Sequence, residues 1–542
     1  MITFSVFDEH GLDSDWLLRH AHLLGADDVV APGRVTFADG LIRCVPQEAG
    51  STALALQMDI GPMGVLTLRT CLLPHRDKPY LLSLELARHQ IMQLFVKLEE
   101  WSEFDRPASD PVMTLFNQAR EKFTIALIME PDPETGGSPQ EDQSARQALE
   151  LALEAGERLT IAHACAALDA KINPSVDDQS PEQPDSPDQA APSLSKGADV
   201  RPTIGMSISP ARFTEPLQQA ITDSADFINL PMRWSDLEAD EGVYAFGPFD
   251  RWIEWAVRTG KMPVVAGPII DLRPGCVPDW LYIWENDYDT LRELIYEHVK
   301  RIVTRYRRTV SNWVVASGLH VAGNFSLSLE QVIDLTRICV LIVRKLHPRA
   351  NIRIEIAQPF GEYAARNTVS LAPQLYAEII AQAGIGVDGF GLQLLMGDVA
   401  PGRSARDLMA IADLIDRYAE FQKPLSISLL GAPGVSPDLA ATGYGEMDPG
   451  YWREPWSPQS QADWLAHVAV VALGHPAVSS VCWQALYDTG SDVDMHAGGL
   501  IDAAGQVRPS LAALKTIHNH IRHNTPLGDL LRSDLVQPVG AK

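Results

Sequence analysis

The sequence predicts an α/β protein, with a (β/α)8 TIM barrel preceded by a smaller N-terminal α+β domain. After residue 200, eight short apolar, β-branched runs alternate with amphipathic helical stretches, a pattern typical of parallel strands joined by helices. Before residue 173, strand-like runs are followed by about three helical stretches. At 542 residues, the chain is long enough for two or three domains.

Residues 1–172 form the expected N-terminal domain. Glycine-punctuated runs rich in Val, Leu, Ile and Thr predict a small antiparallel sheet; these runs are 2–7, 29–46 and 52–73. From Tyr80 the apolar spacing becomes helical, and residues 145–171 are rich in Ala, Leu and Glu. A sheet in front of a barrel suggests a carbohydrate-binding module. Few aromatic residues fall in these strands, so a packing or dimerisation domain is an equal alternative.

Residues 173–200 are expected to be a linker. The segment contains five prolines with aspartates and glutamates between them and almost nothing apolar to bury, as in a solvated, extended tether. The barrel is expected over 201–525, followed by a C-terminal tail at 526–542.

Eight runs are the expected barrel strands: 203–208, 227–232, 263–269, 313–316, 352–356, 389–394, 425–429 and 478–484. The helical stretches between them include 289–306, 329–346, 372–383, 404–421 and 459–473. The alternative is a doubly wound open sheet. It is less favoured because no glycine-rich phosphate loop follows any of the runs.

The composition narrows the classes of function. The formal net charge of −26 argues against nucleic acid and anionic membrane surfaces as partners, since both are bound by clustered Lys and Arg. No stretch of about 18 apolar residues and no signal peptide are recognised, so no membrane span and a cytoplasmic location are expected. The six cysteines are scattered and form no metal-binding or disulfide pattern. We expect no metal and no cofactor.

Several motifs follow one another between residues 201 and 519. They are Met232-Arg233-Trp234 with Gly242-Val243-Tyr244-Ala245-Phe246, Asn312-Trp313-Val314-Val315, Asp388-Gly389-Phe390-Gly391-Leu392-Gln393, and Trp483 with Gly499-Leu500-Ile501-Asp502 and Pro509. In this order they resemble the catalytic domain of glycoside hydrolase family 10, the retaining endo-β-1,4-xylanases. The resemblance implies a β-linked oligosaccharide as ligand, with Trp234 and Trp483 as stacking faces and Arg233 and Gln393 as hydrogen-bond donors.

At the two positions of this chain that correspond, by the same resemblance, to the catalytic glutamates of the family, there is no glutamate. Its acid/base position falls on Gly318 and its nucleophile position on Leu429. Further departures fall on Asn229 for a glutamate, Arg233 for a lysine, and Pro268 and Leu395 for two histidines. A retaining glycosidase needs two carboxyl groups about 5–5.5 Å apart. Because neither Gly318 nor Leu429 has one, the sequence predicts a xylanase-like pseudoenzyme.

Other acids near the strand ends are possible substitutes, foremost Glu355 within strand 5 and Asp271 after strand 3. The remaining candidates are Glu362, Glu446, Asp448, Asp488, Asp492 and Asp494. For each of them a solvated loop acid or a buried ion pair is the simpler interpretation. A strand acid such as Glu355 needs a partner, for which Arg233 is a candidate. His320, just past strand 4, is interpreted as polar surface.

Three functions therefore stay open. The first is a sugar-binding barrel with lost or altered O-glycosyl hydrolase activity. The second is an active glycosidase with relocated carboxylates among Asp271, Glu355, Glu446 and Asp488. The third is a non-enzymatic interaction scaffold, because fold resemblance alone does not establish activity.

Overall fold

The structure is a computed structural model. It describes residues 1–130, 132, 134–174, 201–321, 323–367, 369–400, 402–437, 448–489, 495–532 and 535. The expected linker lies largely outside the described residues, as do part of the expected tail and the candidate acids Glu446, Asp492 and Asp494.

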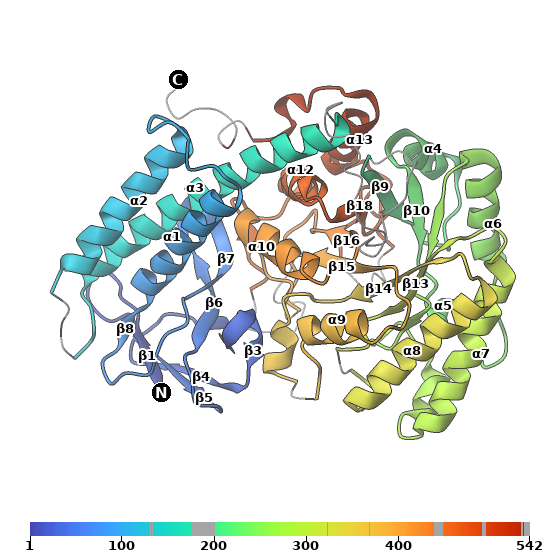
Figure 1. The fold of residues 1–542 in the computed structure, drawn as a ribbon, viewed down its shortest axis with the longest axis horizontal. Helices are drawn as coiled ribbons and strands as arrows, with labels where there is room; N and C mark the ends of the chain where they lie inside the picture. Colours follow the sequence, from blue (N-terminus) through green and yellow to red (C-terminus); the bar gives the residue numbers. More distant parts are fainter. Residues whose placement is uncertain are drawn as a thin grey trace, which may run out of the picture.

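A closed barrel of parallel strands forms the larger part of the molecule (Figure 1). Its strands are β9 (Thr203–Ser207), β10 (Phe227–Leu230), β11 (Val264–Ala266), β12 (Ile270–Asp271), β13 (Asn312–Ser317), β14 (Asn351–Ile356), β15 (Gly389–Leu395), β16 (Leu425–Gly431) and β18 (Val478–Trp483). Both β11 and β12 pair with β13, so they act as one strand, and β18 pairs with β9 to close the ring. The predicted (β/α)8 barrel is confirmed, and the open-sheet alternative is wrong.

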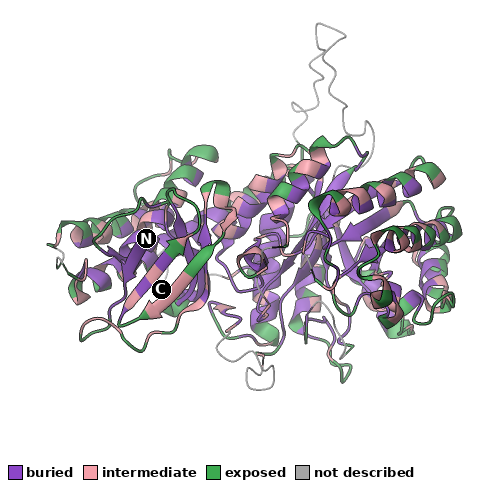
Figure 2. Cartoon of the chain, turned by 90° about the horizontal axis from the view of Figure 1, so that it is seen from below, coloured by how far each residue is buried: buried purple, intermediate pink, exposed green. Residues whose placement is uncertain are grey.

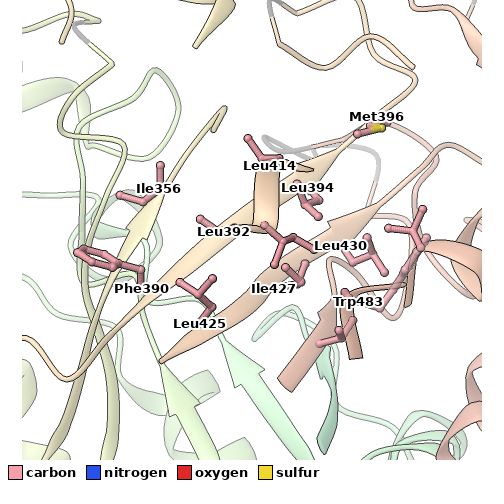
Figure 3. Packing of buried hydrophobic residues seen from close by; sticks show 14 of the residues in the cluster. Ile356, Phe390, Leu392, Leu394, Met396, Leu414, Leu425, Ile427, Leu430 and Trp483 are labelled. Atoms are coloured by element: carbon pink, nitrogen blue, oxygen red, sulfur yellow. The ribbon is translucent and has the colours of Figure 1, made fainter. Parts of the chain in front are cut away.

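The barrel strands are buried on both faces, which explains why they appear in the sequence as continuous apolar runs. All residues of β15 are buried. Figure 3 shows Leu392 and Leu394 of β15 beside Ile427 and Leu430 of β16, with Trp483 of β18 nearby. The strand register shifts between Leu392 and Gln393, and such irregularities redirect side chains at barrel rims.

Helices surround the barrel (Figures 1 and 2). They are α4 (Glu215–Ser224), α5 (Trp234–Leu237), α6 (Gly247–Trp255), α7 (Tyr288–Tyr306), α8 (Leu329–Leu346), α9 (Pro373–Gln382), α10 (Leu408–Ala419), α12 (Pro458–Gly474) and α13 (Pro509–His523). Polar side chains cap the N-termini of several helices: Ser328 and Gln331 form a capping box at α8, and Asp407 caps α10. The helix α12 is buried on nearly all sides, because it packs against barrel strands on one face and helices on the others.

The N-terminal region contains two sheets rather than the one small antiparallel sheet expected. One sheet has the order β4-β5-β1-β8, in which β1 and β8 pair in parallel, and the other has the order β17-β7-β6-β2-β3. The strands are β1 (Ile2–Ser5), β2 (Arg19–Leu24), β3 (Val30–Ala31), β4 (Gly33–Ala38), β5 (Leu41–Pro46), β6 (Ala53–Asp59), β7 (Gly64–Arg69) and β8 (Tyr80–Leu81). Three helices follow: α1 (Leu82–Glu100), α2 (Pro111–Ile128) and α3 (Pro139–Ile172).

The N-terminal region and the barrel share structural elements. The strand β17 (Tyr451–Trp452) comes from the barrel segment between β16 and α12, yet it pairs with β7 of the N-terminal sheet. The helix α3 packs against α10 and α12 (Figure 1). Lys171 near the end of α3 donates hydrogen bonds to the carbonyl oxygens of Leu473, His475 and Val478. The two regions are therefore joined through β-pairing, helix packing and hydrogen bonds.

Among the helices of the described residues, none is long and apolar enough to span a membrane. All six cysteines are free thiols, and four of them are buried.

Candidate active site

A cleft opens at the carboxyl ends of the barrel strands, the end at which TIM barrels bind their ligands. This mouth cleft has a volume of about 710 Å³, part of it open to solvent. Its polar lining residues are Ser207, Ser209, Asn229, Arg233, Asp236, Asp271, Arg273, Glu355, Gln393, Gln484, Tyr487 and Thr489. The strand ends thus bring together two of the predicted binding residues, Arg233 and Gln393, and both foremost substitute acids.

Arg273 fills the space beside Gly318. Gly318 has φ +61°, in the left-handed region, and a Cβ placed there would lie 3.0 Å from Cδ of Arg273. Asp271 fixes this arginine: Arg273 Nη2 lies 2.5 Å from Asp271 Oδ2, and Nε lies 2.9 Å from Oδ1. A side chain at position 318 would have to displace a guanidinium group that is held in a bidentate ion pair.

The lining of the cleft is apolar at Leu429. Leu429 is 5% exposed and clusters with Leu395 and Met495. Positions 429 and 395 are the two at which the resemblance led us to look for a glutamate and a histidine. In this chain both are leucines, and together with Met495 they form one apolar cluster.

Glu355 is fully buried and is held by neutral groups. Gln393 Nε2 donates to Glu355 Oε2 at 2.7 Å and to Ser317 Oγ at 3.2 Å. Burial raises the pKa of Glu355, although hydrogen bonds from Ser428, Ser317 and Gln393 act in the opposite direction. The expected partner, Arg233, is not among these contacts. Gln393 reaches Glu355 because it stands on β15, the strand that pairs with β14, which carries Glu355.

Gln393 also connects Asp271 and Glu355, two of the three acids that line the cleft; the third is Asp236. Its Oε1 accepts a hydrogen bond of 3.4 Å from Nη1 of Arg273, the arginine that is paired with Asp271. Asp271 and Glu355 are therefore linked through Arg273 and Gln393. The Nε2 group of Gln393 is already engaged inside the protein, which differs from the expectation of a donor free for ligand.

The two tryptophans expected to stack on a sugar are buried. Trp234 is 2% exposed, stacks on His298 with ring centroids 4.0 Å apart, and donates from Nε1 to Glu238. Trp483 is 0% exposed and donates from Nε1 to the carbonyl oxygen of Gly498. Neither residue lines the mouth cleft. Their expected role is corrected accordingly, because in this structure both rings are packed as core.

The remaining described acids have structural partners. Asp488 accepts from Arg508 at 2.6 Å and from the Gly499 amide at 2.6 Å. Glu362 pairs with Arg406 and accepts from the Gly402 amide. Asp448 pairs with Arg19 of the N-terminal sheet at 2.9 Å.

His320 is 1% exposed, so its interpretation as polar surface is wrong. Within the residues that the structure describes, no group of acids, histidines and cysteines could hold a metal ion.

Four residues that shape the cleft were missed in the sequence: Arg273, Ser317, Ser428 and Met495. The spacing of Asp271 and Arg273 directly after strand 3 was a usable signal, because two residues at that distance can pair locally. Met495 has no such signal. It reaches the leucine pair from a loop that follows a different strand.

No protein-family model matches this chain. Solved structures with a similar fold include xylanase 10B from Thermotoga maritima, at 16% identity over 59% of this chain and 95% of that one, with a TM-score of 0.44. Xylanase 10B from Thermotoga petrophila RKU-1 in complex with xylobiose matches at 16% identity over 59% and 94%, with a TM-score of 0.45. TsXylA, an intracellular xylanase from Thermoanaerobacterium saccharolyticum, matches at 13% identity over 58% and 95%, with a TM-score of 0.43. At these identities the similarity concerns the fold.

Proposed function

We propose that the mouth cleft binds a β-linked oligosaccharide and does not cleave it by the paired-carboxylate route of family 10. The occupation of the two catalytic positions supports the proposal. Arg273 packs against Gly318, and Leu429 packs against Leu395 and Met495, so neither position has a carboxylate or an empty space for one. Because positions 318 and 429 have no carboxyl group, the chain lacks the nucleophile and the acid at the places where that mechanism has them.

The polar groups of the cleft suit a ligand rich in hydroxyl groups. Gln484 is 7% exposed, and its Nε2 has no hydrogen-bond partner among the described residues. A buried donor left without an acceptor is costly, and a ligand hydroxyl oxygen would satisfy it. Arg233 and Asn229 line the same cleft and add planar groups that fix the orientation of a ligand.

An active hydrolase with relocated carboxylates is the second candidate. Asp271 and Glu355 line one cleft, and burial raises the pKa of Glu355, as in a group that keeps a proton for general acid catalysis. Asp271, paired with Arg273, would be the second carboxyl group of the pair. The third candidate, a non-enzymatic scaffold, is less favoured because the mouth is open to a cleft. A cytoplasmic location belongs to the proposal, and the six free thiols support a reducing compartment.

Proton NMR with xylohexaose tests these candidates together. We expect ligand line broadening without new anomeric signals over a day. The variant Gln484→Leu should weaken binding about tenfold, since it removes one buried hydrogen bond to the ligand. The control Gln382→Leu, on the exposed surface of α9, should bind like the wild type.

Each contrary outcome has a defined meaning. New anomeric signals that disappear in both Asp271→Asn and Glu355→Gln would establish the relocated hydrolase instead. No broadening with xylohexaose or with cellohexaose would refute a β-linked oligosaccharide as ligand and favour the scaffold.

A further inference from the structure

A second cavity lies at the junction of the N-terminal region and the barrel, where the ends of α1 and α12 meet α3 and α10 (Figure 1). It has a volume of about 780 Å³, part of it open to solvent. Most of its wall is apolar and includes Ala164 of α3, Ala412 and Ile415 of α10, and Val471 of α12. Because protein interiors are close-packed, a hollow of this size between two joined regions is a typical place for a small-molecule ligand.

Two stacked rings extend this wall. Trp101, the residue after α1, stacks on His163 of α3 with ring centroids 4.3 Å apart and an angle of 4° between the ring planes. Both side chains are half-buried. Burial lowers the pKa of His163, so its ring is neutral near pH 7. The pair therefore adds flat, uncharged surface to the cavity.

Two accessible carboxylates line the same cavity. The side chain of Asp416 on α10 is 34% exposed, and that of Glu100 at the end of α1 is 51% exposed. Burial acts to raise the pKa of Asp416, but the hydrogen bond from His475 and the charge of Lys97 lower it, so this group is ionised near pH 7. The exposure of both side chains leaves their oxygens within reach of a ligand in the cavity.

The lining that the structure describes contains no positively charged side chain. His475 lines the cavity as a neutral ring, because its Nδ1 accepts from the Ala477 amide at 3.1 Å and its Nε2 lies 2.9 Å from Asp416 Oδ1. Lys97 does not line it and is 2% exposed, with Nζ 2.7 Å from Asp416 Oδ2 and 2.8 Å from Glu100 Oε2. One buried ammonium group is thus shared by two carboxylates, and the cavity keeps a negative charge.

We infer that this junction cavity binds an amine with a hydrocarbon body, whose ammonium group donates to Asp416 and Glu100 while the body packs on the apolar wall and Trp101. A charged donor forms a stronger hydrogen bond to a carboxylate than a neutral donor does. A carboxylate ligand would be repelled by two like charges, and a saccharide would place most of its hydroxyl groups against apolar walls. The cavity shares no lining residue with the mouth cleft, so the inference goes beyond the function proposed above.

Three probes of similar shape and different charge test the inference in the full-length chain: phenethylamine, phenethyl alcohol and hydrocinnamate. Their dissociation constants at pH 7 are measured by ligand-observed NMR. We expect the amine to bind about tenfold more tightly than the alcohol, since a charge-assisted hydrogen bond replaces a neutral one, and hydrocinnamate to bind most weakly. Equal affinities for amine and alcohol, or no binding of the amine, would overturn the inference.

Variants separate this site from the general attraction of an acidic chain for cations. Asp416→Asn should lower the ratio of amine to alcohol affinity about tenfold. The control Glu99→Gln, exposed on the same helix as Glu100 but outside the lining, should leave the ratio unchanged. If Asp416→Asn does not fold because Lys97 loses a partner, Glu100→Gln takes its place and should lower the ratio about threefold. An unchanged ratio in these variants, or an equal fall in Glu99→Gln, contradicts the site.

A larger side chain tests the apolar wall. Ala412 is 7% exposed on α10, and Ala412→Leu should fill part of the cavity and weaken the binding of amine and alcohol to a similar degree. Undiminished binding of both would place the probes elsewhere and overturn the inference. The same variant should bind xylohexaose like the wild type, and Gln484→Leu should bind phenethylamine like the wild type. Failure of the oligosaccharide site and failure of this site are therefore distinguishable.

Discussion

Two glutamates in this chain are buried to nearly the same extent but have different partners. Glu157 of α3 is 0% exposed at the junction of the N-terminal region and the barrel, where Arg453 Nη2 lies 2.6 Å from its Oε2 and Trp452 donates to its Oε1. Glu355 of β14 is 2% exposed at the barrel mouth, where its hydrogen-bond partners are an amide and hydroxyl groups.

The difference indicates what each region does. At the junction, Glu157 and Glu154 raise the pKa of Arg453, as expected for a buried cation between two carboxylates, and the three charges hold β17 against α3. Burial raises the pKa of both glutamates, but the hydrogen bonds that Glu355 accepts come from neutral groups, whereas Glu157 accepts from Arg453 and Trp452. The junction therefore pairs its buried acid with a buried arginine, and the mouth surrounds Glu355 with an amide and hydroxyl groups.

The largest effect should come from the junction. Glu157→Gln keeps the shape but removes the fully buried one of the two carboxylates that pair with Arg453, so we expect a loss of about 3 kcal/mol in the free energy of unfolding. Glu154→Gln removes the more exposed partner of the same arginine and should cost about 1 kcal/mol. Urea denaturation followed by tryptophan fluorescence measures both. Equal losses of unfolding free energy in the two variants would mean that the more deeply buried carboxylate, Glu157, contributes no more to stability than Glu154.

The barrel was predictable because its signal is local. Each parallel strand is a buried apolar run between helical stretches, and the run at 389–394 became β15 (Gly389–Leu395) with one added residue. The strand β17 has no such signal. It has only two residues, and its partner β7 lies nearly 400 positions earlier in the chain, so only the tertiary structure defines it as a strand.

The sequence predicts which catalytic carboxylates the site lacks, but not which side chains pack at those positions. The absence of carboxylates at Gly318 and Leu429 follows from the sequence alone. The side chains that pack at these positions do not follow from it. Arg273 packs against Gly318 and Met495 contacts the Leu429 cluster, and both come from other loops. The burial of Trp234 likewise depends on His298 of α7, a contact that no local pattern encodes.

A glycine substitution tests whether Arg273 really closes the mouth at position 318. Gly318→Ala should lose about 2 to 3 kcal/mol in the free energy of unfolding, from the left-handed backbone and from crowding against Arg273. Gly505→Ala is the matched control, since its φ is +85° with nothing within 4 Å of the added carbon, and it should lose about 1 to 2 kcal/mol. Urea denaturation of the pair gives the difference. Equal losses of stability in the two variants would mean that the Arg273 side chain moves aside without a free-energy cost, so that it does not block a side chain at position 318.

The smallest effect is a pH dependence that belongs to Glu355. Its pKa in the folded state is raised above its value in the unfolded chain, so between these two values the folded state binds one proton more. Stability then falls as pH rises, by about 1.4 kcal/mol per pH unit within that window.

A glutamine at this position is neutral in both states, so the variant does not lose stability in this way as pH rises. Glu355→Gln should therefore match wild type near pH 4 and become progressively more stable relative to it above that pH, as measured by urea midpoints at each pH. The exposed control Glu330→Gln, in the first turn of α8, should show no such divergence. If wild type and Glu355→Gln remain parallel from pH 4 to pH 7, burial does not raise the pKa of Glu355, and this carboxyl group is ionised in the fold throughout that range.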